Sequence, residues 1–455
     1  MTPGQNPPRW SAAAPALLGA FDRDALALSR YAAAGAGLLA DLPPKPDRSP
    51  EQLALAADVH RCCRRARSVF LHEYARPLYN TLTAGRTRRP RLAELAYAAA
   101  ELVPGLVPTA EQITAERLHI QADKEGWEID QGILFRALFR VPEVGAHLLD
   151  SMLAPTPRAQ RLLPAFAAEG LVELGAVRLE RHGETAHLTV RNLHCLNAED
   201  DALIEDMETA VDLVLLDEQV SVGVLRGGPM THPRYLGRRV FSAGVNLIDL
   251  YRGQISFVDF MLRREVGYIS KLMRGLLVDD DWAAWPRRTL DKPWLAAVDG
   301  FAIGGGMQLL LAVDRVVAAN DAYLSLPAAQ EGIVPGVANL RLSRHTGGRL
   351  AREVILGGRK LWASEPAARA VVDEAVDAQR MDEAVRAHAE RLAAPAVRAN
   401  RRMLNLADEP TDRFREYLAE FSVEQALRIY GSDVIEKVRL TADRARRAEA
   451  VGSHG

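Results

Sequence analysis

The spacing of apolar residues changes near residue 176, and this change constrains the fold more than any other feature of the sequence. Before it, apolar residues recur at helical spacing. One predicted helical face consists of Val59, Cys62, Cys63, Ala66, Val69 and Phe70. From 177 to 190, apolar and polar residues alternate around a turn at His182-Gly183, which is typical of a β-hairpin. The sequence therefore predicts a helical domain at 1–175, followed by a region that contains β-strands.

Helices and strands alternate beyond the hairpin. An amphipathic helix is predicted from the shared face of Met207, Ala210, Val211, Val214 and Leu215. A short apolar run from Val220 to Leu225 then predicts a strand. The order of elements therefore begins as two strands, one helix and one strand.

A second apolar strand leads directly into a run of glycines. The segment from Trp294 to Val298 predicts this strand, and Gly304-Gly305-Gly306 follows it. The next residues, from Met307 to Val317, are so apolar that we expect a buried helix. Alternating strands and helices predict an α/β core at 176–400, and we assign 401–455 to C-terminal helices.

The composition limits the partners that the chain can have. Its 455 residues exceed the roughly 250 to 300 at which single cores stop growing, so we expect two domains. The net charge of −2 lacks the basic excess of a nucleic-acid binder. No run approaches the ~20 apolar residues of a membrane span. Three cysteines, two of them adjacent, provide neither a disulfide framework nor a CxxC zinc site, which favours a cytoplasmic setting.

The glycines after the predicted strand suit a ligand site. Glycine lets the backbone approach a ligand closely, and the first turn of a helix presents N–H groups that lack helical acceptors. The helix dipole also favours negative charge at this end. Gly305 is therefore well placed to donate a hydrogen bond to a developing oxyanion. Taken alone, the glycines could equally serve tight packing of the strand on the helix.

Four segments, taken in order, resemble motifs of the crotonase (enoyl-CoA hydratase/isomerase) superfamily. They are Leu196-Asn197-Ala198, Phe241 to Leu247, Lys292 to Gly306, and Val334-Pro335-Gly336 with Arg341, Leu342 and Arg344. The resemblance covers roughly 176–400, and such a match in several parts is stronger than a lone motif. It implies a crotonase-like ββα superhelical core that binds an acyl-coenzyme A thioester. It also implies an oxyanion hole formed by the N–H groups of Val245 and Gly305, and assembly into trimers or hexamers.

Two positions depart from the hydratases of this superfamily. Those enzymes use two glutamates for acid and base work, and the resemblance aligns them with Gln308 and Ala328. Neither residue can exchange a proton near pH 7. A simple hydratase is therefore disfavoured.

The same departures resemble a cofactor-independent dioxygenase branch that acts on 3,5-dihydroxyphenylacetyl-CoA in glycopeptide-antibiotic pathways. That branch also carries a long helical N-terminal domain. The similar stretches are Leu196 to Asp201, Val258 to Phe260, Arg263 to Glu265, Ser325 to Ala329 and Asn400 to Asp408. The resemblance implies that Glu199, Arg264 and Gln308 line an aryl pocket and handle the ring hydroxyls and the reacting end. It also places Ile333 beside Val245 as an apolar wall.

This resemblance implies a reaction without a metal or another cofactor, because the substrate itself supplies the electrons. Coenzyme A is part of that substrate, and dioxygen is the cosubstrate. An oxyanion hole lowers the cost of forming the enolate, which can then reduce dioxygen. A resulting peroxide would attack the thioester, release coenzyme A and leave an arylglyoxylate. A dry apolar pocket would protect the intermediates from water.

Several alternatives stay open from the sequence. A non-oxidative thioesterase, hydratase or isomerase would use the same oxyanion hole, and a non-catalytic protein could simply bind acyl-CoA. Glu199 could be a charge at a helix N-terminus, and Arg264 an exposed helix arginine. His182 and Glu184, with His187 or His194, imitate the ligand triad of iron oxygenases, but the place of His182 and Glu184 on a hairpin turn favours turn chemistry. The base that removes the α-proton is not identified.

Overall fold

The structure is a computed structural model, and it describes residues 10–11, 14–279, 281, 283 and 288–452, with side chains as far as residue 447. Contacts divide the chain into two compact units. The first unit consists of Met1–Ser151, Leu250–Val258 and Arg415–Gly455, and the second of Met152–Asp249 and Asp259–Phe414. Because these units follow contacts and not sequence order, they differ from the three predicted segments.

The first unit contains helices and no strand within the residues that the structure describes. Its helices are α2 (Phe21–Ala40), α3 (Pro50–Leu82), α4 (Leu92–Leu102), α5 (Ala110–Glu116), α6 (Glu128–Arg140), most of α7 (Pro142–Leu153), most of α17 (Thr411–Arg428) and α18 (Ser432–Gly452). The helix α3 begins with a capping box, in which the Ser49 hydroxyl accepts from the Gln52 N–H and the Gln52 side chain accepts from the Ser49 N–H. The helical domain predicted from spacing is therefore confirmed in this part of the chain.

One residue of the predicted α3 face lies elsewhere. Val59, Cys63 and Phe70 are buried, as predicted, but Val69 is 46% exposed. Ten residues of an α-helix turn Val69 about 80° away from Val59, so it falls outside the buried stripe. The prediction that Val69 shares this face is wrong.

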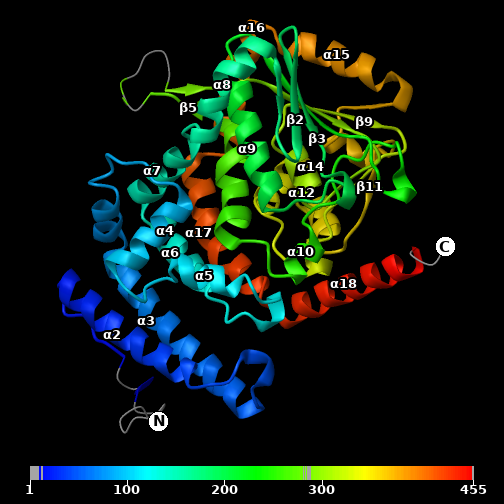
Figure 1. Cartoon of the computed structure of the whole chain (residues 1–455). Coiled ribbons are helices and arrows are strands. Elements are labelled where there is room, and N and C mark those ends of the chain that lie inside the picture. The colour runs from blue at the N-terminus through cyan, green and yellow to red at the C-terminus, as the bar shows by residue number, and fades with distance from the viewer. Residues whose placement is uncertain (1–9, 12–13, 280, 282, 284–287, 453–455) are drawn as a thin grey trace. The chain divides into compact units, whose positions relative to one another are not determined.

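The second unit is built on a seven-stranded sheet. Its strands are β1 (Leu171–Glu173), β2 (Val177–His182), β3 (Thr185–Val190), β4 (Val222–Gly227), β7 (Trp294–Val298), β9 (Arg315–Ala319) and β12 (Glu374–Val376), in that spatial order. The pairs β1–β2 and β2–β3 are antiparallel, and the other pairs are parallel. Helix α9 (Asp201–Leu216) connects β3 to β4 and packs against β2 (Figure 1). The predicted hairpin, amphipathic helix and following strands are confirmed.

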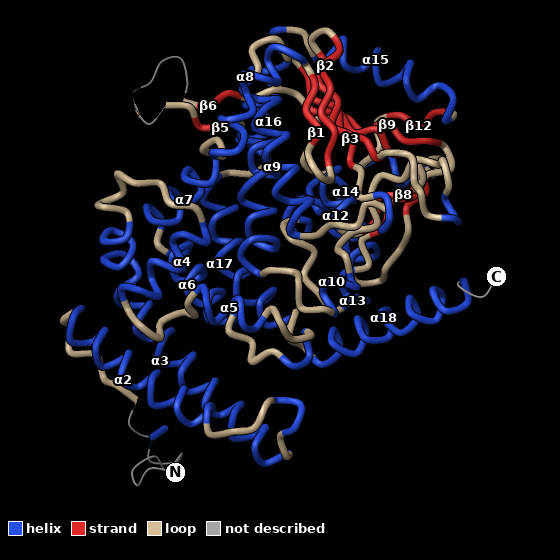
Figure 2. Tube along the Cα trace, in the orientation of Figure 1, coloured by secondary structure: helices blue, strands red, loops and turns tan. Residues whose placement is uncertain are grey.

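Two smaller sheets complete this unit (Figure 2). One joins β11 (Leu361–Trp362), β10 (Tyr323–Ser325) and β8 (Phe301–Ile303), and the other joins β5 (Leu276–Leu277) to β6 (Thr289–Leu290). The strand β8 matters most for function, because it leads directly into the three glycines.

The apolar run after the glycines is not one helix. Helix α12 (Gly305–Leu310) ends before residue 311, and β9 begins at Arg315. The predicted helix from Met307 to Val317 is therefore wrong in its second half. The β-branched Val316 and Val317 are buried in the main sheet, where β9 pairs with β7 and β12, so sheet pairing overrides the apolar helical pattern.

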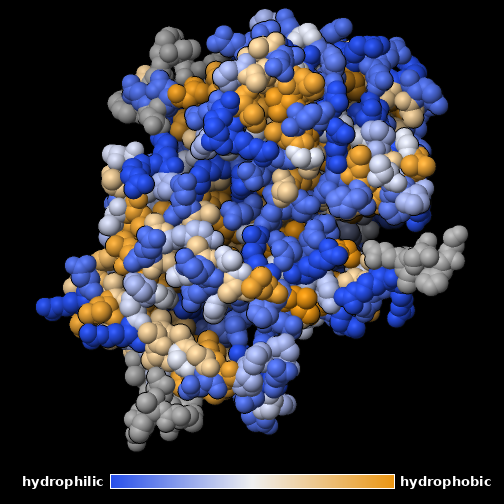
Figure 3. All heavy atoms as spheres, viewed as in Figure 1, coloured by the Kyte–Doolittle hydropathy of each residue, from blue (hydrophilic) through white to orange (hydrophobic). Residues whose placement is uncertain are grey.

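The remaining elements of the second unit are mostly helices. They are α8 (Pro157–Glu169), most of α10 (Leu247–Tyr251), most of a π-helical turn at Phe257–Leu262, a second π-helical turn at Glu265–Ile269, α11 (Ser270–Arg274), α13 (Ala328–Glu331), α14 (Ala338–Ile355), α15 (Met381–Leu392) and α16 (Pro395–Asp408). Hydrophilic residues cover most of the face drawn in Figure 3, with hydrophobic residues in smaller groups among them. No helix among the described residues is long and apolar enough to cross a membrane.

Candidate active site

Two loops that are far apart in the sequence meet at a pair of glycines. The Ile303 N–H donates to the Ser242 carbonyl at 2.9 Å and holds the loops together. Just beyond, a Cβ on Gly244 would lie 3.0 Å from the Ile303 carbonyl oxygen and 3.4 Å from Gly304 Cα. Gly244 and Gly304 also have positive φ angles of 85° and 53°. Glycine is therefore needed at both positions for the backbones to approach so closely.

Val245 and Gly305 directly follow these two glycines. The Glu199 N–H donates to the Gly244 carbonyl at 2.7 Å, and the Asn246 N–H donates to the Glu199 carbonyl at 2.8 Å. Because successive strand residues point their N–H groups to opposite sides, the Val245 N–H is turned away from Glu199. Gly305 is the first residue of α12, where no helical acceptor exists. Among the described residues neither N–H has an acceptor, so both are available to a ligand.

Buried polar side chains surround Gly305. Arg264 binds Glu199 through two hydrogen bonds, from Nε to Oε2 at 2.9 Å and from Nη2 to Oε1 at 3.0 Å. Its Nη2 also donates to the Gly305 carbonyl at 2.7 Å, and its Nη1 donates to Gln308 Oε1 at 2.9 Å. Arg264 is 3% exposed and Glu199 is 5% exposed. Arg264 thus joins the other two predicted polar residues of the site, Glu199 and Gln308, to Gly305.

The environment keeps Arg264 charged. Burial by itself would lower the pKa of Arg264, but Glu199, the Tyr268 ring and Glu265 together raise that pKa above its ordinary value. The alternative that Arg264 is an exposed helix arginine is wrong, because the side chain is enclosed and paired.

Residues 180–427 match the enoyl-CoA hydratase/isomerase family. The chain belongs to this family. The crotonase-like α/β core expected from the sequence is thereby confirmed, with a helical region before it and helices after it.

Similar proteins differ in how much of the chain they match. The (3,5-dihydroxyphenyl)acetyl-CoA 1,2-dioxygenase of Amycolatopsis orientalis is 56% identical over 415 residues, which cover 91% of this chain and 95% of that protein. The enoyl-CoA hydratase domain-containing protein 2, mitochondrial, of Bos taurus is 35% identical over 40% of this chain and 53% of its own length. The solved structure of Pseudomonas aeruginosa OdaA is 25% identical, has a TM-score of 0.48, and covers 59% of this chain and 98% of its own.

Gln308 and Ala328, the two positions where the sequence departs from the hydratase pattern, both lie in the first turn of a helix. Gln308 lies in the first turn of α12 and is half-buried against Arg264. Ala328 opens α13 and is buried. A carboxamide and a methyl group therefore stand at the two positions that the resemblance aligns with the hydratase glutamates, and neither can exchange a proton near pH 7.

Ile333 lies in the turn between α13 and α14. Its N–H donates to the Ala328 carbonyl at 3.0 Å, and its side chain is half-buried, as is that of Val245. The same turn reaches the polar cluster at Gly336, where a Cβ would lie 2.6 Å from Gln308 Oε1. The turn that carries Ile333 therefore borders the site, and contact between Ile333 and Val245 stays a prediction.

Sequence reasoning assigned no role to Glu265 or Tyr268, although both lie in the cluster. Arg264 stands between two π-helical turns, a rare geometry that often marks functional sites. The Tyr268 ring lies 5.9 Å from the Arg264 guanidinium, and burial raises its pKa above the ordinary value. The sequence carries no signal for π-helical turns, so only the structure reveals these two neighbours.

The hairpin residues that imitate an iron site are arranged differently. Glu184 Oε2 accepts a hydrogen bond from the Ser221 hydroxyl at 2.9 Å, while the His182 and His187 rings contact each other at 5.2 Å between centroids. Within the part of the chain that the structure describes, no group of three or more His, Cys, Asp and Glu residues could hold a metal ion. The iron alternative therefore gains no support from these residues.

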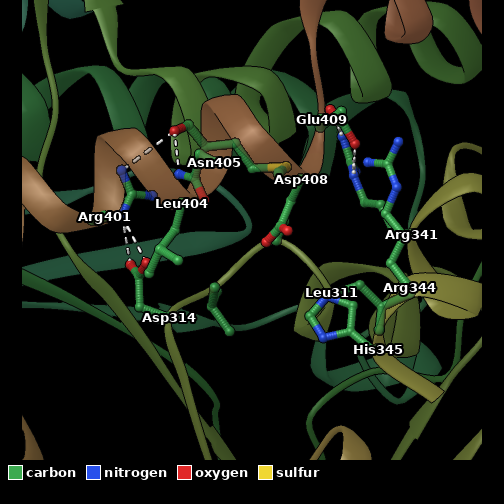
Figure 4. A pocket seen from close by; sticks show the side chains of 13 residues that line it. Leu311, Asp314, Arg341, Arg344, His345, Arg401, Leu404, Asn405, Asp408 and Glu409 are labelled. Carbon is green, nitrogen blue, oxygen red and sulfur yellow. Dashed lines mark hydrogen bonds and ion pairs between the residues drawn. The ribbon is translucent and has the colours of Figure 1, made fainter. Parts of the chain in front are cut away.

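Apart from the Arg264 cluster, a cavity of about 270 Å³ lies between α14 and α16 (Figure 4). Arg341 binds Glu409 on one side of it, with hydrogen bonds of 2.9 and 3.1 Å, and Arg401 binds Asp314 on the other. Asp408 points into the space between these pairs. Arg341 belongs to one of the motifs seen in the sequence, and it is buried in its ion pair with Glu409.

Proposed function

We propose that this chain is a dioxygenase that converts (3,5-dihydroxyphenyl)acetyl-CoA and dioxygen to the arylglyoxylate and free coenzyme A. The observation that carries the proposal is the 56% identity to a dioxygenase of this name over 91% of the chain and 95% of that relative. The geometry of the site agrees with this activity, because the two free N–H donors are retained where the hydratase glutamates are absent.

The chemistry follows from an enolate. Hydrogen bonds from the N–H groups of Val245 and Gly305 to the thioester oxygen stabilise the negative charge that forms when the α-proton leaves. The enolate gives one electron to dioxygen, and the two radicals combine into a peroxide at the α-carbon. The peroxide oxygen then attacks the thioester carbonyl and expels the coenzyme A thiolate. The second α-hydrogen then leaves as a proton, its C–H electron pair forms the ketone, and the O–O bond breaks to leave the carboxylate. Both oxygen atoms thus enter the product, and no external reductant is needed.

The polar cluster supplies recognition of the aryl ring in this proposal. Each carboxylate oxygen of Glu199 accepts one hydrogen bond from Arg264 and keeps a lone pair that can accept from a ring hydroxyl. Gln308 faces the same space with its NH₂ group. Val245 and Ile333 provide apolar surface, which suits dioxygen and keeps water from the intermediates. Arg264 is the common hydrogen-bond partner of Glu199 and Gln308.

An oxygen-coupled assay tests the proposal. Purified, chelator-treated protein is incubated with the thioester while dioxygen uptake and coenzyme A release are followed together. We expect one dioxygen consumed per coenzyme A released, and no release under argon. Release that continues under argon would instead identify a non-oxidative thioesterase, hydratase or isomerase, and retention of the thioester without turnover would identify a binding protein.

The setting and assembly of the protein are part of the same proposal. The low cysteine content supports a reducing, cytoplasmic location. We also expect a homo-oligomer, either a trimer or a hexamer, as the resemblance to crotonases implies. Light scattering coupled to gel filtration gives the mass directly, and a mass of one chain, 49.9 kDa, would contradict this expectation.

A further inference from the structure

Arg264 uses every hydrogen-bond donor that it has. A guanidinium carries five N–H bonds, one on Nε and two on each Nη. Three of them serve Glu199 and the Gly305 carbonyl, as described above. The two on Nη1 serve Gln308 Oε1 and Glu265 Oε1, both at 2.9 Å. Because no donor remains for a ligand, Arg264 acts on the substrate only through the groups that it holds.

This saturation fixes the orientation of Gln308. Arg264 can only donate, so the atom of the carboxamide that faces it must be the oxygen. The NH₂ group of Gln308 therefore points away from Arg264, and among the described residues it has no acceptor. Rotation of the guanidinium would release this orientation.

Glu265 holds the opposite side of the guanidinium. Its Oε1 accepts from Arg264, and its Oε2 accepts from the Val337 N–H at 3.3 Å. The carboxylate is 2% exposed and lies against Gly336, where a Cβ would be only 2.1 Å from Oε1. Glu265 therefore connects Arg264 to the turn before α14, which also carries Ile333.

The connection extends outward as a chain of alternating charges. Arg341 Nη1 lies 3.9 Å from Glu265 Oε2, Arg341 also binds Glu409 (Figure 4), and Glu409 binds Arg274 at 2.9 Å. With Arg264 and Glu199, this gives three positive and three negative groups in alternation, all buried except Arg274, which is half-buried. A buried charge without its partner is costly, so each group restrains its neighbours.

We propose that Glu265 is a positioning residue, which holds Arg264 in the one orientation that presents the Gln308 NH₂ group and the Gly305 N–H to the substrate. The inference rests on the proposed dioxygenase function. Loss of the Glu265 charge leaves Arg264 Nη1 without its one charged acceptor, since Gln308 Oε1 is a neutral carboxamide oxygen. The guanidinium can then rotate, and both the carboxamide and the first turn of α12 lose a fixed partner.

The substitution Glu265→Gln tests this inference, because it keeps the shape and removes the charge. We expect kcat to fall by about tenfold or more while KM for the thioester changes little, since small displacements of catalytic groups affect the chemical step most. In a Gln308→Ala background the same substitution should lower kcat by less than about threefold, because the effects of substitutions at two coupled residues do not add. Glu265→Asp, which keeps the charge, should recover part of the loss.

Glu128→Gln is the matched control, because Glu128 is also buried and accepts two hydrogen bonds, from the Phe257 N–H and the Tyr430 hydroxyl. We expect it to lower Tm and leave kcat per folded protein unchanged.

Two results would overturn the inference. One is a wild-type kcat in Glu265→Gln, and the other is a loss in the double variant that equals the sum of the losses from Glu265→Gln and Gln308→Ala. If Glu265→Gln does not fold, a Glu265→Asp variant with wild-type Tm and lowered kcat supports the inference, and one with wild-type kcat overturns it. If the wild-type protein consumes far less than one dioxygen per coenzyme A released, the proposed function is overturned, whereas the role of Glu265 is judged from the variants.

Discussion

Replacing Gly305 by alanine tests the oxyanion hole through one added methyl group. That Cβ would lie 2.0 Å from Glu199 Oε2, 2.6 Å from Glu199 Cδ and 2.9 Å from Glu199 Oε1. An ordinary contact between these atoms is about 3.4 Å or more, so one side must move by more than about 1 Å. Glu199 cannot yield easily, because two hydrogen bonds to buried Arg264 hold its carboxylate. We therefore expect the first turn of α12 to shift away from the Val245 loop.

The expected loss is that of one misplaced oxyanion donor. Removal of such a donor lowers kcat by about 10² to 10³, or about 3 to 4 kcal/mol of barrier. Alanine itself favours helix over glycine by up to about 1 kcal/mol, so the loss of stability should be smaller than the loss of activity. The assay measures dioxygen uptake and coenzyme A release with the arylacetyl thioester, alongside Tm.

A matched glycine provides the control for this prediction. Gly348 lies in α14, and a Cβ there would meet nothing within 4 Å. Gly348→Ala should keep wild-type activity and Tm. If Gly305→Ala also retains kcat within about threefold of wild type, the Gly305 N–H does not stabilise the transition state, and the reasoning from geometry to mechanism is refuted.

Three further changes give distinct outcomes. Gln308→Glu removes the NH₂ donor and places a third carboxylate beside Arg264, so dioxygen uptake per coenzyme A released should fall by about tenfold, measured with an oxygen electrode. Arg264→Met leaves the buried carboxylates of Glu199 and Glu265 unpaired, which should cost about 3 to 5 kcal/mol in urea unfolding; an unchanged unfolding midpoint would contradict the network. Burial raises the pKa of Glu116 to about 7, so the folded chain binds a proton that the unfolded chain releases from about pH 4.5 upward. Stability should therefore fall as pH rises from about 4.5 to about 7, and Glu116→Gln should flatten that dependence in unfolding curves taken across the range.

Local patterns in the sequence were sufficient for much of the fold. The alternation around His182-Gly183 and the apolar run from Trp294 to Val298 predicted strands that the structure contains at the same places. The helix that ends at Leu310 shows the limit of such patterns. A continuous apolar run fits a buried helix and a buried strand equally well, and only pairing of Val316 and Val317 with neighbouring strands decided between them.

The sequence by itself determined the residue types of the site: glycines that permit close approach at 244 and 304, and side chains at 308 and 328 that cannot exchange protons. Only the tertiary structure decided how these residues act together. Arg264 lies 65 residues from Glu199 and 41 from Gly305, so no local spacing predicts that one guanidinium joins them. Its five donors are matched because π-helical turns, the α12 start and the turn at Gly336 converge on one buried point. Such convergence depends on the packing of the whole unit. The role inferred for Glu265 therefore follows from the tertiary contacts around Arg264 and from no local pattern in the sequence.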